Sequence, residues 1–347
     1  MKMNISHPYK DNISFSFGQF TQVVGQDQQL KYYIWQILLW YFGGKKYSEE
    51  DLVLFEQNEP KILIDDTVVS RSQFRVIQLS NINDLIEQME YKKGTIAYDY
   101  LKKKINTVEM MEQLENINDH LDRISLLLNH NLNLQLDGIN YHTEAKYFNA
   151  DQLIQKNFLP YFGQNDKNIS FEFVDNKTKF LLFLSMLQVV ITDQSEKVLL
   201  VLRNMDDYLS YKEFVECCEQ LERLTIHCNM LYTISYPSNE GYLHVTKEVL
   251  EEINIVSSYI DHFYSLEFMY ERFTNQYPIN QIPSKQEFLS SLRKIGPYLF
   301  SADILHMSLS IEDQVSLRIL NNLYQYEMKI KFRIEPVNPM LLKYLEE

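Results

Sequence analysis

Apolar residues recur along the chain with two different periods, which predict where strands and helices lie. Near the N-terminus, Ile13, Phe15 and Phe17 alternate with polar neighbours, and a second short apolar run covers residues 20–24. Alternation with period two is typical of strands, whereas apolar residues three and four apart are typical of helices. An amphipathic pattern of the second kind begins near Gln28. The chain is therefore predicted to open with two strands, a turn and a helix.

Later segments combine strands with helices in a regular order. Further strands are predicted at residues 61–64 and 74–79, with a turn at Asp65 and Asp66 between them. A compact unit follows, made of helix 178–191, strand 197–202, helix 211–224 and strand 230–235, with another strand expected within 259–268. The continuous apolar run 198–202 suits a strand that is buried on both faces of a parallel sheet. Together these elements predict an α/β domain.

The middle of the chain has a helical pattern. No proline occurs between Pro60 and Pro160, and apolar residues spaced by three and four recur at Leu114, Ile117, Leu121, Ile124 and Leu128. This spacing predicts long antiparallel helices, a helical hairpin or leg, over residues 82–158. The apolar stripe is explained either by packing within the subunit or by a seam between subunits.

The pattern of predicted helices and strands changes after Tyr277-Pro278 and Ile282-Pro283. Ser284 to Glu287 and Ser310 to Asp313 have the spacing of capping boxes that start helices. A last strand is predicted at 328–334. The expected domains are a discontinuous α/β head (1–81 and 159–275), a helical leg (82–158) and a small α+β C-terminal extension (276–347).

Composition limits the classes of function. The chain has 347 residues, of which 45% are hydrophobic and 23% charged, and this balance is typical of an ordered globular protein. A net charge of −14 disfavours general affinity for nucleic acid, so a DNA site requires a segregated basic patch. The longest apolar stretch, 32–42, is too short to span a membrane, and the polar N-terminus lacks a secretory pattern. We expect a cytoplasmic protein.

Residues 19–32, Q-F-T-Q-V-V-G-Q-D-Q-Q-L-K-Y, have the outline of a nucleotide-binding P-loop without its nucleotide chemistry. That motif reads G-x-x-x-x-G-K-[S/T] between a strand and a helix. Gly25 and Lys31 fit it, but Leu30 replaces the second glycine and Tyr32 replaces the hydroxyl that holds Mg²⁺. The four residues predict a degenerate nucleotide loop. A chance pairing of one glycine and one lysine in a strand-turn-helix unit is the alternative.

A second feature argues against nucleotide hydrolysis. In P-loop ATPases the buried central strand ends in carboxylates that support Mg²⁺, whereas here it ends in Arg203 and Asn204. Asp206 and Asp207 come later, in a predicted turn. The chain contains no H-E-x-x-H or G-x-S-x-G motif, and Cys217, Cys218 and Cys228 form no C-x-x-C pair. We predict no catalytic residues and no metal site.

Basic residues occur in clusters. The candidate DNA contacts are Lys45, Lys46, Lys92, Lys93, Lys102, Lys103, Lys104, Lys329, Lys331 and Arg333. Each cluster alone is explained by a solvated surface. Several clusters facing one cavity would instead bind duplex DNA through its phosphates, without reading sequence.

The order of these elements resembles the Csn-two (Csn2) family of adaptation proteins from type II-A CRISPR loci, in its long form. The resemblance covers residues 12–270 and includes the degenerate loop, the helical insertion and two segments, K-V-L-L-V-L-R-N-M-D-D-Y-L-S-Y-K-E-F (197–214) and L-Y-T-I-S-Y-P (231–237). It implies an ABC-ATPase-like head that no longer hydrolyses ATP, a leg, and a homotetrameric ring. It also implies binding to the ends of double-stranded DNA during spacer acquisition, beside the integrase pair and the effector nuclease.

Calcium is the one cofactor that the resemblance implies, because short-form members bind it between leg and head. The corresponding stretch here, 129–137, carries amides where acids are expected, so its acidic ligands are lost and any site is predicted to be weak. Our leading hypothesis is a non-enzymatic DNA-end-binding ring. The alternatives are a slow nucleotidase that uses Lys31 with Asp206 or Asp207, and a scaffold that binds only proteins.

Overall fold

The computed structural model describes most of the chain. The described residues are 1–9, 13–56, 58–132, 134–164, 167–192, 196–237, 242–257, 259–301 and 309–326. The predicted last strand, with Lys329, Lys331 and Arg333, lies outside them.

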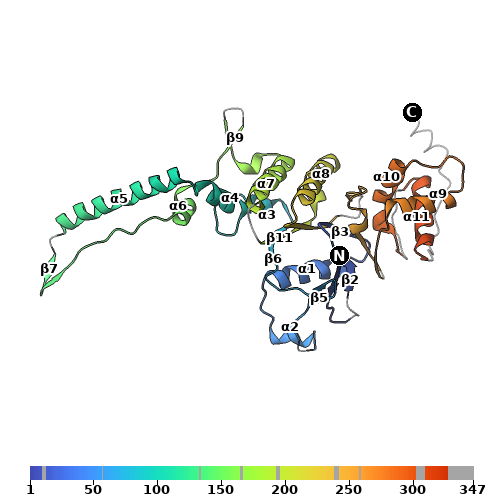
Figure 1. Cartoon of the computed structure of the whole chain (residues 1–347), viewed down its shortest axis with the longest axis horizontal. Helices are drawn as coiled ribbons and strands as arrows, with labels where there is room; N and C mark the ends of the chain where they lie inside the picture. The colour runs from blue at the N-terminus through green and yellow to red at the C-terminus, as the bar shows by residue number, and fades with distance from the viewer. Residues whose placement is uncertain are drawn as a thin grey trace, which may run out of the picture.

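A six-stranded sheet forms the centre of the molecule (Figure 1). Its strands, in spatial order, are β14 (Ile260–His262), β13 (Ile253–Val256), β3 (Phe20–Val24), β12 (Leu231–Tyr236), β11 (Lys197–Arg203) and β6 (Phe74–Leu79). Neighbouring strands are parallel except β14, which runs antiparallel to β13. The predicted strands 20–24 and 74–79 match β3 and β6, and 197–202 matches β11 to within one residue.

Helices cover both faces of this sheet. Helices α7 (Asn176–Ile191) and α8 (Tyr211–His227) pack on one face, against alternate residues of β11 that include Leu200. Helix α1 (Gln28–Phe42) covers the other face, where Leu199 and Val201 are buried. Because successive side chains of a strand point to opposite faces, the uninterrupted apolar run of β11 is the pattern that burial on both faces requires.

A second, antiparallel sheet lies beyond α1. Its order is β2 (Ile13–Ser16), β1 (Lys2–Ile5), β4 (Ile62–Ile64) and β5 (Thr67–Val68), and it shares a core with α1. The hydrophobic pattern did not predict β1, because this strand has only four residues and one of its two partners, β4, is distant in the chain. The short helix α2 (Glu49–Val53) lies in the same lobe, drawn in blue in Figure 1.

The leg differs from the predicted helical hairpin. The chain passes through α3 (Ile82–Glu87) and α4 (Ile96–Ile105) into one long helix, α5 (Val108–Asn131). A small hairpin, β7 (Gln135–Leu136) and β8 (Ile139–Asn140), reverses the chain, which then returns without helical structure to α6 (Ala150–Asn157). Figure 1 shows this extended return segment beside α5. A helix packed on a strand-like segment therefore replaces the second long helix.

Asparagine side chains explain the extended return. Asn118 of α5 donates to the Phe148 carbonyl at 3.1 Å and accepts from the Phe148 amide at 2.8 Å. Asn129 does the same at Thr143, at 2.7 and 2.6 Å. These bonds satisfy backbone groups that a second helix would have satisfied internally.

The C-terminal helices share their core with the head. Helices α9 (Leu266–Gln276), α10 (Lys285–Ile295) and α11 (Ile311–Leu323) pack around a cluster that also contains residues of β3 and β13. Ser284 caps α10 with the predicted capping box, and Ser310 caps α11. The extension is thus not a separate unit, and most of the expected strand 259–268 is loop or the start of α9.

Shorter elements complete the described chain. They are the hairpin β9 (Phe162–Gln164) and β10 (Lys167–Ile169) and the 3-10 turns η1 (Phe171–Phe173), η2 (Met205–Asp207), η3 (Leu250–Glu252) and η4 (Gly296–Tyr298). Across the described residues, no helix combines the length and the apolar character needed to cross a membrane.

Candidate functional site

The loop after β3 is closed against the neighbouring strand. Gly25 has a φ of 115°, and a Cβ atom added to it would lie 2.1 Å from the carbonyl oxygen of Val256 in β13. The amide of Asp27 donates to the same carbonyl at 3.2 Å. Glycine is therefore required here for close contact between two backbones.

The start of α1 also uses its own backbone donors. The side chain of Asp27 caps the helix by accepting from the Leu30 amide at 2.9 Å, and the Lys31 amide donates to the Asp27 carbonyl at 3.0 Å. Leu30 is buried in the core beneath the helix. In a phosphate-binding loop, such amides point at the ligand. Here protein oxygens accept from the amides of Asp27, Leu30 and Lys31.

Beside this loop lies a cavity of about 210 Å³. Its wall consists of Gln28, Lys31, Tyr32 and Trp35 from α1, Arg203 and Asn204 at the end of β11, and Tyr236 and Pro237 at the end of β12. The carboxyl ends of parallel strands are the usual ligand-binding edge of an α/β sheet. The structure thus brings together Lys31 and Arg203, which the sequence presented as two unrelated departures from the P-loop pattern.

Two positive charges meet at this cavity. Lys31 is only 7% exposed. Burial, followed by the nearby Arg203 charge, lowers the pKa of Lys31 to about 8, although Asp206 and Asp27 act in the opposite direction. The Arg203 guanidinium carbon lies 4.7 Å from the centroid of the Trp35 ring and 5.4 Å from that of Tyr32. Stacking on two aromatic rings holds the arginine in place.

Several predicted DNA-binding lysines have acidic partners. Lys45 lies 3.3 Å from Asp51 and sits over the Trp40 ring, Lys92 pairs with Glu90, and Lys102 lies 2.8 Å from Asp151. The Lys92 and Lys102 side chains are more than half exposed, so these pairs are weak and leave the lysines accessible.

The structure brings only some of these lysines together. Lys93 and Lys102 both lower the pKa of Asp151, after hydrogen bonds from Lys102 and Tyr98, so both lie at the base of the leg, where α4 meets α6. Lys103 has a different role, because its ammonium donates to the Val189 carbonyl of α7 at 2.9 Å.

Lys104, Lys45 and Lys46 are the other predicted lysines within the described residues. Lys104 is exposed and lies 5.6 Å from the Tyr100 ring. Lys45 and Lys46 belong to the segment that joins α1 to α2, and Figure 1 draws these two helices away from α4 and α6. One subunit therefore presents separate basic patches.

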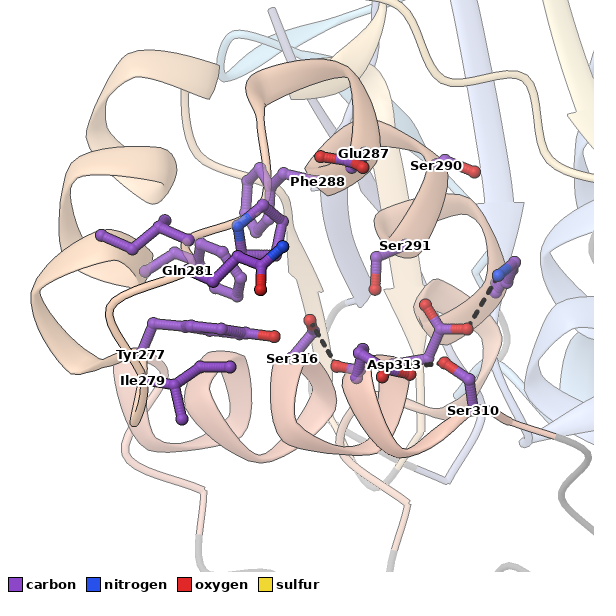
Figure 2. A pocket seen from close by; sticks show the side chains of 15 residues that line it. Tyr277, Ile279, Gln281, Glu287, Phe288, Ser290, Ser291, Ser310, Asp313 and Ser316 are labelled. Carbon is purple, nitrogen blue, oxygen red and sulfur yellow. Dashed lines mark hydrogen bonds and ion pairs between the residues drawn. The ribbon is translucent and has the colours of Figure 1, made fainter.

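A larger cavity of about 480 Å³ lies between the C-terminal helices (Figure 2). Asp313 of α11 points into it and pairs with Lys294 of α10 at 2.8 Å. The Ser310 hydroxyl caps α11 by accepting a hydrogen bond from the Asp313 amide at 3.1 Å. Since the buried carboxylate is already paired, this cavity contains a structural ion pair that joins α10 to α11.

Two residues of the stretch 129–137, which the resemblance relates to calcium binding, have other structural roles. The carboxamide of Asn129 is hydrogen-bonded to the backbone of Thr143. Asp137 lies at the tip of the β7–β8 hairpin with a φ of 49°. Within the described ranges, no three His, Cys, Asp or Glu side chains lie close enough to hold a metal ion.

The architecture defines a mixed α/β protein with a large, mostly parallel sheet, an inserted leg and appended helices. Residues 5–346 match the family model described as CRISPR-associated protein Csn2, subfamily St. The chain belongs to the Csn2 family of CRISPR-associated proteins.

One solved structure agrees with this family assignment. The crystal structure of Stu0660 of Streptococcus thermophilus is 42% identical, with a TM-score of 0.93, and the alignment covers 99% of this chain and 100% of that one. A structure of the SmcHead bound to the C-winged helix domain of ScpA aligns at 10% identity and a TM-score of 0.43, over 77% of this chain and 98% of that one. Comparison with curated proteins gave no match.

Proposed function

We propose that this chain is a non-enzymatic protein of CRISPR spacer acquisition that assembles as a homotetrameric ring and binds the ends of double-stranded DNA. Family membership supports the CRISPR role. The observation that carries the non-enzymatic part is the closed loop at Gly25, whose neighbouring amides are bonded to Val256 and Asp27. The integrase pair and the effector nuclease are the proposed protein partners in the cytoplasm.

The loop geometry argues against ATP. A triphosphate needs backbone donors and room beside the glycine, and Val256 occupies that room. The adjoining cavity of about 210 Å³ is also smaller than the roughly 300–1,000 Å³ of typical small-molecule sites. We infer that the head is a degenerate P-loop domain that serves as a scaffold.

The leg supports self-assembly. Ile117, Ile124 and Leu128 of the predicted apolar stripe are exposed, and only Leu114 among its members is fully buried. Toward the tip, apolar side chains are more exposed still: Leu126 70%, Leu127 67%, Leu136 72% and Ile139 73%. Contiguous exposed apolar surface is typical of protein interfaces. A second copy of the chain is the proposed partner of this surface.

Assembly also supplies a reason for the dispersed lysines. Four copies around an axis would repeat each basic patch four times, which can line one hole although a single subunit cannot. Lys93 and Lys102 at the base of the leg are the best candidates for phosphate contacts, since both are exposed. Lysine contacts of this kind bind duplex DNA irrespective of sequence and weaken steeply with salt.

The test compares linear duplex with closed circular duplex of the same sequence. Fluorescence anisotropy should give tight binding to the linear form, independent of sequence, with log affinity falling linearly with log salt. Equal affinity for the circle would contradict binding at ends. Light scattering on the same sample should give the mass of four copies.

A matched pair of variants tests the lysines. The double change Lys93→Gln and Lys102→Gln should lower affinity and reduce the salt slope, because each lost phosphate contact removes about one unit of slope. Lys212→Gln, an exposed lysine of α8 outside the predicted clusters, is the control. An equal loss in both variants would contradict the assignment.

The slow-nucleotidase alternative is supported by one electrostatic interaction. Asp206 is close enough to Lys31 to affect its pKa, as a lysine-carboxylate pair at a nucleotide site would be. Hydrolysis of ATP with Mg²⁺ that Lys31→Ala abolishes would favour that alternative. A tetramer that binds neither linear nor circular DNA would favour the protein-only scaffold.

A further inference from the structure

We propose that the cavity between Lys31, Arg203 and Tyr236 is an anion site that holds one phosphate group. The site differs from a P-loop because it uses side chains instead of loop amides. It is independent of the proposed DNA-binding surface, whose lysines lie elsewhere, and it stands whether or not the protein encircles DNA.

The charges of the wall favour an anion. Lys31 and Arg203 come from different elements, α1 and the end of β11, and both line the same cavity. Like charges repel, and the Arg203 charge accordingly lowers the pKa of Lys31, second only to burial. An anion between them would replace this repulsion with two charge-assisted hydrogen bonds, which are among the strongest polar contacts in proteins.

The strongest independent observation concerns the Tyr236 hydroxyl, a hydrogen-bond donor for which the described residues supply no acceptor. Tyr236 lines the cavity and is only 6% exposed, and its hydroxyl has no hydrogen-bond partner among the described residues. Burial raises the pKa of Tyr236, so the hydroxyl keeps its proton and remains a donor, even though the nearby Arg203 charge acts in the opposite direction. Buried polar groups without partners are rare in proteins and call for an explanation.

Other wall residues add donors of the same kind. The indole N–H of Trp35 is buried and also lacks an acceptor among the described residues. Gln28 and Asn204 contribute carboxamides to the wall. Two cations and several neutral donors form a set that suits a doubly charged oxyanion, whose oxygens only accept.

The volume of the cavity limits the size of the ligand that it can hold. The cavity volume of about 210 Å³ admits a single phosphate group but is below the range of sites that bury a drug-sized ligand such as a nucleoside. The source of the phosphate is either free inorganic phosphate or the terminal 5′-phosphate of a polynucleotide. Both present the same tetrahedral dianion.

The test uses the full chain with inorganic phosphate and, at equal ionic strength, chloride. Phosphate should raise the melting temperature in a saturable way, because a ligand that binds only the folded state stabilises it. It should also change the fluorescence of Trp35 on binding. No saturable effect beyond that of chloride would overturn the proposal.

Two variants locate the site. Arg203→Gln should weaken phosphate binding by roughly tenfold or more, since it removes a charged donor, whereas Arg318→Gln on the exposed side of α11 should not. If Arg203→Gln fails to fold, Tyr236→Phe tests the same site by removing only the hydroxyl. Tyr208→Phe is its matched control, because the Tyr208 hydroxyl is likewise buried with no partner in the described part of the chain, but Tyr208 does not line this cavity. Equal phosphate responses in Tyr236→Phe and wild type would overturn the assignment.

A proton-linked readout distinguishes binding at Lys31 from binding elsewhere. Sulfate has no proton to exchange near pH 8, so at that pH its binding should draw protons onto Lys31, whose pKa would rise beside an anion. Calorimetry in buffers of different ionisation enthalpy measures this uptake, which Lys31→Gln should abolish. Binding without proton uptake would contradict the site.

Competition separates the two sources of phosphate. A 5′-phosphorylated duplex that displaces inorganic phosphate, with a 5′-hydroxyl duplex that does not, identifies the DNA end as the ligand. No displacement by either duplex supports free phosphate as the ligand. Equal displacement by both would show that internal phosphodiesters enter, and would overturn the assignment to a doubly charged phosphate.

Discussion

Gly25 and Val256 are in such close backbone contact that no other residue fits at position 25. The Cβ of an alanine would lie 2.1 Å from the Val256 carbonyl oxygen, in a backbone with a φ of 115°. We predict that Gly25→Ala lowers the free energy of unfolding by at least about 2 kcal/mol, from overlap and backbone strain together.

Gly94 is the control for this prediction. It also has a positive φ, 100°, but nothing lies within 4 Å of the position of its Cβ. Gly94→Ala should cost only the backbone term, about 1 kcal/mol. Urea denaturation measures both variants, and equal losses would mean that the contact with Val256 does not matter.

The asparagine contacts of the leg predict a local effect. Replacing both Asn118 and Asn129 with alanine removes the four bonds that hold the return segment at Phe148 and Thr143. Hydrogen exchange at those two amides should accelerate strongly while the head is unaffected. Asn116→Ala, an exposed asparagine of the same helix, should leave the exchange unchanged.

The apolar tip of the leg predicts an assembly defect. Leu126→Glu and Leu127→Glu should shift the particle toward smaller species, because a charge would then be buried at the proposed seam. Ile311→Glu, at an apolar side chain of α11 that is 68% exposed, should leave the mass unchanged. Native mass measurement decides, and an unaltered tetramer in the leg variant would exclude this surface as the seam.

Cysteine reactivity follows from burial. Burial raises the pKa of Cys217 to about 12 and that of Cys218 well above its ordinary value, so neither forms thiolate at neutral pH. Cys228 is partly exposed. A thiol reagent should therefore label one cysteine of three in the native protein, and all three after unfolding. Labelling of Cys217 in the native state would contradict the packing of α8.

The ion pair of the C-terminal helices predicts a dependence on pH. Burial is the largest single effect on Asp313 and disfavours its ionisation, but the hydrogen bonds to its carboxylate, the strongest from Lys294, together with the Lys294 charge outweigh burial and lower the pKa of Asp313 below the ordinary value. A carboxyl with a depressed pKa stabilises the fold above its ordinary pKa and loses that contribution as the pH falls through the depressed value.

Asp313→Asn should consequently be less stable than wild type at pH 7. The difference should narrow once the pH falls below about 3.9, the ordinary value for aspartate. Asp119→Asn, at an exposed position of α5, is the control. A difference that is constant with pH would point to a packing effect of the substitution.

The sequence was informative where structure depends on neighbours along the chain. The strand before Gly25, helix α1 and strand β11 were predicted because their apolar periods are local. Strand β1 was missed because its four residues are too few to establish a period, and one of its two partners, β4, lies far away in sequence. The return segment of the leg was misassigned because its conformation depends on side chains of another element, Asn118 and Asn129.

The sequence indicated some residues of the candidate cavity but not that they lie together. Each of Lys31 and Arg203 was noticed as a departure from the P-loop pattern, but their proximity depends on the order of parallel strands. One signal was available, since the end of the central strand lies beside the loop in any P-loop fold. Tyr236 carried no such signal, because only the three-dimensional structure reveals that its hydroxyl lacks an acceptor within the described ranges.

Because the C-terminal helices and strand β13 share one hydrophobic core, the chain cannot be cut between them into two independently stable domains. Phe288 and Leu317 pack in the same cluster as Ile253 and Ile255 of the head. Deleting the chain after residue 276 would uncover the apolar edge of the central sheet, so the shortened chain should aggregate. A stable chain without the extension would therefore require compensating polar substitutions on the strand that the extension covers.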